Sequence, residues 1–171
     1  QVLATRRNGD GRHRPAMGLD DPLRRDRMEP KLSARIAHDK GALVHTDAVQ
    51  SFGKIPVDVD RLGVDLLTVS AHKIYGPKGV GALYVRRGTD IRPLIHGGHQ
   101  EGGLRAGTEN TAGIVGFGEA VRVLGERMKK DKDRLEKLAQ RLKTGIESGV
   151  PKVRFNGHLE RRVKSTLNFA F

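Results

Sequence analysis

The sequence of 171 residues contains no cysteine and no tryptophan, and only 4% of its residues are aromatic. The lack of cysteine excludes disulfide bonds, cysteine-ligated metals and a cysteine nucleophile within this chain. The net charge of +12 could attract nucleic acid, but few aromatic side chains are present to stack on unpaired bases. Much of the positive charge lies in 127–143 with Asp and Glu interspersed, which favours a solvated helix face. We therefore expect no nucleic-acid partner.

Long hydrophobic runs are also missing from the sequence. No run approaches the ~18 apolar residues that a membrane-spanning helix needs, and the first residues lack the apolar core of a secretory signal. We expect no membrane partner and a location in the cytoplasm. The length suffices for one domain with a hydrophobic core.

The apolar pattern that is present predicts a layered α/β fold. Its apolar runs do not alternate and are separated by helical or long connections, which favours a sheet that is mostly parallel. The third run follows the second after a short loop, so this pair could form a hairpin and the sheet could be mixed. The predicted strands are 42–46, 65–71, 80–87, 152–157 and 165–171, all but the last two buried. The predicted helical segments are 31–41 and a turn at 59–62. From Asn110 on, apolar residues at helical spacing predict one amphipathic helix, or two in sequence, of roughly 35 residues in all, ended by Gly149-Val-Pro151.

The two ends of the chain carry separate expectations. Residues 1 to about 30 are rich in Arg, Gly, Asp and Pro without apolar periodicity, which predicts a loop or disorder. The last apolar run reaches residue 171 with no turn after it, so we expect a domain that has been cut.

The loop "GPKGVG" (76–81) has glycines but not the chemistry of a nucleotide-binding loop. A P-loop needs G-x-x-x-x-G-K-[S/T] leading into a helix, whereas this loop leads into a predicted strand. We expect a tight turn between two strands.

Polar residues follow two of the predicted strands. Lys73 stands at the end of the second with Ser70 and His72 beside it, and Asp47 follows the first. Strand ends of this kind bind ligands in open α/β sheets. A buried lysine and a buried carboxylate there would be costly unless they share a task, such as binding the aldehyde of pyridoxal phosphate. The plain alternative is a lysine that only reaches solvent.

A second glycine-rich segment, "HGGHQEGGLRAGTEN" (96–110), leads into the long helix. Thr108 fits the N-cap of that helix and could also offer its hydroxyl to a phosphate. His96 and His99 have no carboxylate partner nearby in sequence, so we expect no metal site.

Two long segments, "HTDAVQSFGKIPVDVDRLGVDLLTVSAHKIYGPKGVGALYVRRG" and "PLIHGGHQEGGLRAGTENTAGIVGFGEA", resemble the cysteine desulfurases of the class V aminotransferase family. The resemblance runs from about Ala34 to Phe171. It implies a fragment of the fold type I, aspartate aminotransferase-like transferases. Residues 34–125 would belong to the cofactor-binding large domain, 126–171 would form a linking helix and the beginning of a small C-terminal domain, and 1–33 would be an unmatched, disordered segment.

The resemblance also implies roles for individual residues. Lys73 would be the catalytic lysine that binds pyridoxal 5'-phosphate as a Schiff base, with His72 acting beside it. Asp47 would pair with the pyridine nitrogen. The other implied cofactor contacts are Gln50 to the ring 3′-oxygen, Ser70 and His72 to the phosphate, and Thr108 to the phosphate of a partner subunit in a homodimer.

The family converts L-cysteine to L-alanine and passes the sulfur as a persulfide to acceptor or scaffold proteins for iron–sulfur cluster assembly. In the family a loop cysteine takes the sulfur, and a glycine-threonine phosphate cradle and a histidine stacked on the cofactor lie upstream. None of these is found here, and His99 and Gly102 replace a usual glycine and arginine. We expect this chain to be inactive alone. Two alternatives are another class V lyase or aminotransferase that needs no cysteine, and a non-catalytic remnant or binding module.

Overall fold

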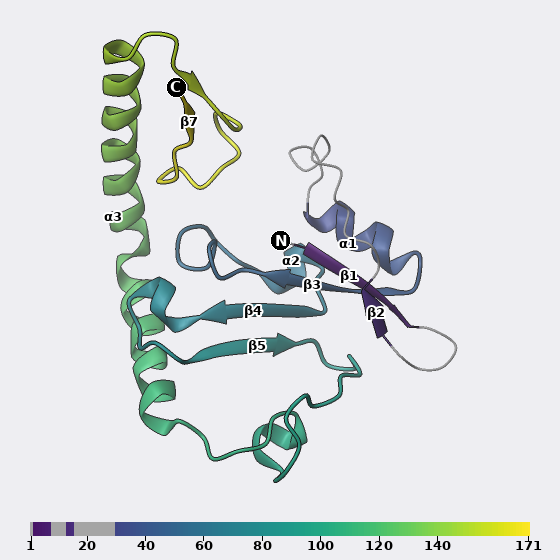
Figure 1. Ribbon diagram of the computed structural model, residues 1–171. Helices are drawn as coiled ribbons and strands as arrows, with labels where there is room; N and C mark the ends of the chain where they lie inside the picture. The colour runs from purple at the N-terminus through teal and green to yellow at the C-terminus, as the bar shows by residue number, and fades with distance from the viewer. Residues whose placement is uncertain (1, 8–12, 16–29) are drawn as a thin grey trace.

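A computed structural model describes residues 2–7, 13–15 and 30–171 (Figure 1). In this described part, five strands form one sheet in the order β2-β1-β3-β4-β5, and two short strands pair separately near the carboxyl end. The strands are β1 (Val2–Arg7), β2 (His13–Pro15), β3 (Ala42–Asp47), β4 (Leu66–Ser70), β5 (Gly81–Val85), β6 (Arg154–Phe155) and β7 (Phe169–Ala170). The helices are α1 (Pro30–His38), α2 (Val59–Leu62), α3 (Thr111–Gly149) and the 3₁₀ turns η1 (Ala71–Ile74) and η2 (Gln100–Gly103).

The hydrophobic core lies between α1 and one face of β3 and β4. Val44 and Leu67 point to this face and pack with Ala34 of α1. The buried carboxylate of Asp65 accepts the backbone N–H of Val44 at 2.7 Å and contacts His38 Nε2 at 2.8 Å. Because a buried charge is costly unless it is paired, these two contacts fix the end of α1 against the sheet.

The hairpin between β4 and β5 confirms the predicted mixed sheet. β3 and β4 are parallel, whereas β4 and β5 are antiparallel with Val69 opposite Ala82. The connecting loop turns at Gly79, whose φ of +78° favours glycine, as expected for a tight turn. The prediction that the third strand is buried was wrong, because β5 lies at the edge of the sheet and Leu83 is 49% exposed.

The amino-terminal segment differs from its prediction. The structure has strands at Val2–Arg7 and His13–Pro15, where the sequence indicated a loop or disorder. β1 pairs antiparallel with the free edge of β3, with Ala4 opposite Val44. The open backbone groups of β3 offer a template that local composition does not reveal. Residues 1, 8–12 and 16–29 lie outside the described residues.

The long helix α3 is a single helix, as one reading of the sequence allowed. Its N-cap is Asn110, whose side chain accepts the N–H of Gly113 at 3.0 Å. The expected cap at Thr108 was therefore wrong: Asn is as good a cap as Thr, and the chain becomes helical two residues later than the sequence suggested. In Figure 1 the first half of α3 stands beside the carboxyl end of β4.

The carboxyl-terminal strands β6 and β7 lie beside the second half of α3 (Figure 1). The rings of Phe155 and Phe169 meet edge to face at 5.5 Å, and Lys143 of α3 lies 5.2 Å from the Phe155 ring centre. These strands were expected, although each is only two residues long. Among the described residues, no helix combines the length and apolar character needed to cross a membrane.

Candidate functional site

The parallel pairing of β3 and β4 brings the predicted site residues to one edge of the sheet. Asp47, the last residue of β3, is opposite Thr68 of β4, and the backbone N–H of Ala48 continues the ladder to the Thr68 carbonyl at 2.9 Å. Ser70 ends β4 two positions further on. The carboxyl ends of both strands therefore open at the same place, which is where α/β sheets bind ligands.

Asp47 and Ser70 also share one face of the sheet. Side chains alternate along a strand, so His45 and Asp47 point together, and so do Thr68 and Ser70. His45 Nε2 contacts Thr68 Oγ1 at 3.3 Å, which places both pairs on the face opposite the α1 core. Burial lowers the pKa of His45 below the ordinary imidazole value. The negative charge of Asp47 acts in the opposite direction but has the smaller effect.

The segment after β4 carries Lys73 on the short turn η1. Ser70 Oγ and His72 Nδ1 lie 2.8 Å apart, so these two side chains already form a polar pair before the lysine. The turn ends at Tyr75, which has a φ of +67° and donates its N–H to the Ala71 carbonyl. Residues in such conformations persist only where their surroundings impose them and are common at functional sites.

The expected burial of the charged pair was wrong. Asp47 and Lys73 are both exposed, because each follows a buried stretch of strand and stands at the open edge of the sheet. Asp47 Oδ1 accepts the N–H of Val49 at 2.9 Å, which turns the chain away from β3. Gln50 is also exposed, and its Oε1 accepts from Lys54 Nζ at 3.2 Å.

Thr108 stands apart from the other predicted residues. It is exposed in the loop before α3, and within the described residues it makes no hydrogen bond to Asp47, Gln50, Ser70, His72 or Lys73. The structure thus brings together the residues of β3, β4 and η1 but leaves Thr108 outside the cluster.

Gln100, which the sequence interpretation passed over, ties this loop together. Its Oε1 accepts the N–H of Gly107 at 3.1 Å, and the N–H of Ala106 reaches the carbonyl of Ile95 at 3.2 Å. A Cβ on Gly98 would lie 2.5 Å from the same Gln100 oxygen, so a larger residue there would displace the Gln100 side chain from this position. The only sequence signal for this role was the position of Gln100, a long amide side chain, between two pairs of glycines.

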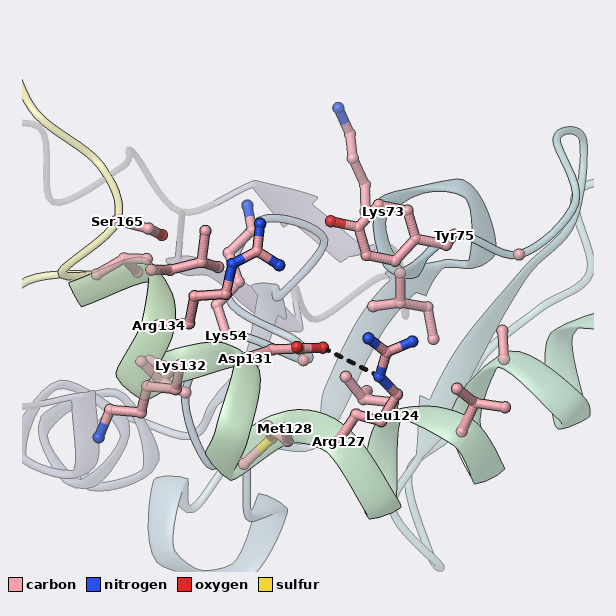
Figure 2. A pocket seen from close by; sticks show the side chains of 18 of the residues that line it. Lys54, Lys73, Tyr75, Leu124, Arg127, Met128, Asp131, Lys132, Arg134 and Ser165 are labelled. Carbon is pink, nitrogen blue, oxygen red and sulfur yellow. Dashed lines mark ion pairs between the residues drawn. The ribbon is translucent and has the colours of Figure 1, made fainter. Parts of the chain in front are cut away.

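A pocket of about 1080 Å³ lies between η1, α3 and residues 160–165. Figure 2 shows that Lys73 borders this pocket with its amine directed away from α3, while Arg127 and Asp131 form an ion pair at 3.6 Å across the helix surface. No group of three or more His, Cys, Asp or Glu residues suited to a metal occurs within 2–7, 13–15 and 30–171.

The chain belongs to the class-V aminotransferase family, whose pattern it matches over residues 29–171. The match starts at residue 29, slightly before Ala34, where the resemblance inferred from the motifs begins. The α/β sheet with a long helix agrees with this family, so the predicted fold class is confirmed.

Similar proteins carry a more specific name. "Cysteine desulfurase IscS" of Dictyoglomus turgidum is 51% identical over 138 residues, which cover 81% of this chain and 35% of that protein. The protein of the same name from Clostridium botulinum strain Hall is 48% identical over 147 residues, or 84% of this chain and 37% of that one. The chain thus spans about a third of the length of these relatives.

Solved structures that resemble this chain carry similar names. A "NifS-like protein" is 43% identical with a TM-score of 0.76, and the match covers 83% of this chain and 39% of that one. The apo structure of a cysteine desulfurase from Thermococcus onnurineus NA1 is 27% identical with a TM-score of 0.71, covering 84% and 40%.

Proposed function

We propose that this chain is the lysine-bearing part of a pyridoxal phosphate-dependent cysteine desulfurase. The observation that carries the proposal is the shared edge and face of β3 and β4, where Asp47 is opposite Thr68 and the Ser70–Lys73 segment follows two residues later. The names of the relatives supply the removal of sulfur from cysteine. The family resemblance adds L-alanine as the second product and transfer of the sulfur to an acceptor.

The residues present fit pyridoxal phosphate. Within the described part of the chain, Lys73 Nζ makes no hydrogen bond or ion pair, so this amine is free to bind an aldehyde. Ser70 and His72 offer a hydroxyl and an imidazole to a phosphate from the same strand end. Asp47 keeps Oδ2 available for a pyridinium N–H, since the hydrogen bond from the Val49 N–H uses Oδ1.

Bound pyridoxal phosphate would supply an electron sink for charge that develops on the substrate α-carbon. Residues of this chain would bind and orient the cofactor and would move the protons. Asp47 would hold a proton on the ring nitrogen, and Gln50 would orient the ring oxygen. Lys73 would move the proton of the substrate α-carbon, because its flexible stem extends from η1, the turn directly after β4. His72 would hold the phosphate from the same turn.

For the whole protein we propose the wider properties of the family. These are a homodimer in which Thr108 reaches the partner's phosphate, a cytoplasmic location, and delivery of sulfur to acceptor proteins for iron–sulfur cluster assembly. In that protein, 34–125 would belong to the large domain, and 126–171 would form a linking helix and the beginning of the small domain, with α3 running uninterrupted across the boundary.

Absorbance spectroscopy tests the proposal on the chain as it stands. Adding pyridoxal phosphate is expected to produce a band near the edge of the visible range that Lys73→Ala abolishes. Lys78→Ala is the matched control, because Lys78 is exposed in the loop just after η1. L-cysteine is expected to perturb this band more than L-serine. A band that survives in Lys73→Ala, or no band in the unsubstituted chain, would overturn the proposal.

A further inference from the structure

Gln50, which we propose orients the cofactor ring, has a partner that the proposed reaction does not use. Lys54 lies four residues further along the chain, and its Nζ donates a hydrogen bond to Gln50 Oε1 at 3.2 Å. A lysine ammonium group has three donors and no acceptor, so the atom of Gln50 that faces it must be the amide oxygen. The contact therefore decides which way round the Gln50 amide stands.

The backbone after β3 brings these two side chains together. The carbonyl of Ser51 accepts the N–H of Lys54 at 2.9 Å and the N–H of Ile55 at 3.1 Å. Hydrogen bonds that span three and four residues are those of helical turns, in which side chains four positions apart are neighbours. Lys54 is partly buried, whereas Gln50 is exposed. The local turn thus places the better-held side chain beside the freer one.

The same turn packs against the segment that carries Lys73. A Cβ on Gly53 would lie 2.7 Å from Ile74 Cγ2 and 3.0 Å from Leu124 Cδ2. Gly53 also has a φ of +80°, in the left-handed region that favours glycine. The backbone just before Lys54 is therefore held closely against η1 and α3. Its position is set relative to η1, and so relative to the amine that we propose binds the cofactor.

The orientation of the Gln50 amide leaves its donors free. With the oxygen turned to Lys54, the two N–H groups on Nε2 point to the other side, and within the described residues they make no hydrogen bond. The ring 3′-oxygen of pyridoxal phosphate is an acceptor when it is ionised, so only this orientation of the amide suits it. The ammonium group also polarises the amide and makes its N–H groups stronger donors.

We propose that Lys54 is a positioning residue for the cofactor, which holds the Gln50 amide with its N–H groups toward the ring 3′-oxygen. This inference rests on the proposed function, since it needs pyridoxal phosphate beside Gln50. Lys54 would touch neither the cofactor nor the substrate and would act only through Gln50. The plain alternative is a lysine that reaches solvent past Gln50 without affecting the cofactor.

NMR of the cofactor-free chain tests the orientation of the amide. The side-chain amide resonance of Gln50 is expected to shift in Lys54→Met, which keeps the length of the side chain but removes the donor. It is expected to return toward its original position in Lys54→Arg. Lys78→Met, in the exposed loop after η1, is the matched control and is expected to leave the resonance unchanged. A Gln50 resonance that does not respond to Lys54→Met would overturn the proposal.

Titration of the absorbance band with pyridoxal phosphate tests the effect on the cofactor. Lys54→Met is expected to weaken binding about fivefold, which corresponds to one hydrogen bond of about 1 kcal/mol, and Lys54→Arg is expected to restore it. In a Gln50→Ala background, Lys54→Met is expected to cause no further loss, because Lys54 acts through Gln50. Equal losses in both backgrounds would overturn this inference and leave the proposed function intact. Absence of the band from the unsubstituted chain would overturn both.

Discussion

At the scale of single residues, Gln100 shows how a side chain can organise a loop that has little regular structure. Its amide oxygen bridges to Gly107, and Gly98 leaves room for it. The loop it closes ends next to Thr108, the residue that we propose contacts a phosphate across a dimer. Gln100 would therefore act as a positioning residue for Thr108, with no contact of its own to the cofactor.

The hydrogen bond from Gly107 to Gln100 yields a prediction with its own control. Gln100→Glu keeps an oxygen that accepts the Gly107 N–H, whereas Gln100→Met keeps the length but loses the acceptor. Losing a hydrogen bond of about 1 kcal/mol is expected to speed exchange of the Gly107 amide several-fold in Gln100→Met, with little change in Gln100→Glu. Amide exchange measured by NMR checks this. Equal exchange in the two variants would mean that Gln100 does not hold the loop.

At the scale of elements, α3 connects the candidate site to the carboxyl-terminal strands. Its start is fixed by Asn110, and its first turns pack against the η1 segment that carries Lys73. Gly116 lies so close to Pro77 that a Cβ there would sit 2.6 Å from the proline ring. The position of the lysine-bearing turn therefore depends on where this helix begins and how closely it approaches.

The N-cap of α3 can be tested by comparing two neighbouring residues. Asn110→Ala removes the acceptor for the Gly113 N–H and is expected to lower the free energy of unfolding by about 1 kcal/mol. Thr108→Ala, the control, is expected to change it much less, because Thr108 lies before the cap. Urea unfolding followed by circular dichroism measures both. A larger loss in Thr108→Ala would restore Thr108 as the cap.

The elements that the sequence predicted correctly are those with strong local signals. β3, β4, α2 and α3 follow from apolar runs, helical spacing and end glycines. The N-cap was misplaced because Thr108 and Asn110 are both capping residues, and only the backbone conformation decides between them. β1 was missed because its pairing depends on the free edge of β3, which is a tertiary property.

For the candidate site, the position of its residues could be predicted from the sequence, but their exposure could not. Asp47 and Lys73 were placed together because parallel strands end at the same edge, and the register of β3 and β4 agrees with that reasoning. Their exposure was not predictable, since it depends on what covers the edge in space. Gln100 was missed because its role comes from contacts across a loop rather than from a motif.

At the scale of the whole molecule, the most consequential property is the missing cysteine. The 171 residues contain no thiol that could receive sulfur from a substrate, and the chain corresponds to about a third of the length of its relatives. We predict that the isolated chain with pyridoxal phosphate does not release alanine and sulfide from L-cysteine. Assays of both products check this, with a full-length desulfurase as the positive control. Sustained turnover would contradict this prediction, because it would show that the reaction needs neither a cysteine in the chain nor the part of the relatives that this chain lacks.

Covalent trapping tests directly whether Lys73 is the amine that binds the cofactor. The chain is incubated with pyridoxal phosphate, reduced with borohydride, digested and mapped by mass spectrometry. We expect the modification to concentrate on Lys73, to be lost in Lys73→Ala and to be reduced in Asp47→Asn, while Lys54 and Lys78 remain mostly unmodified. Even labelling of exposed lysines, or labelling that spares Lys73, would contradict it.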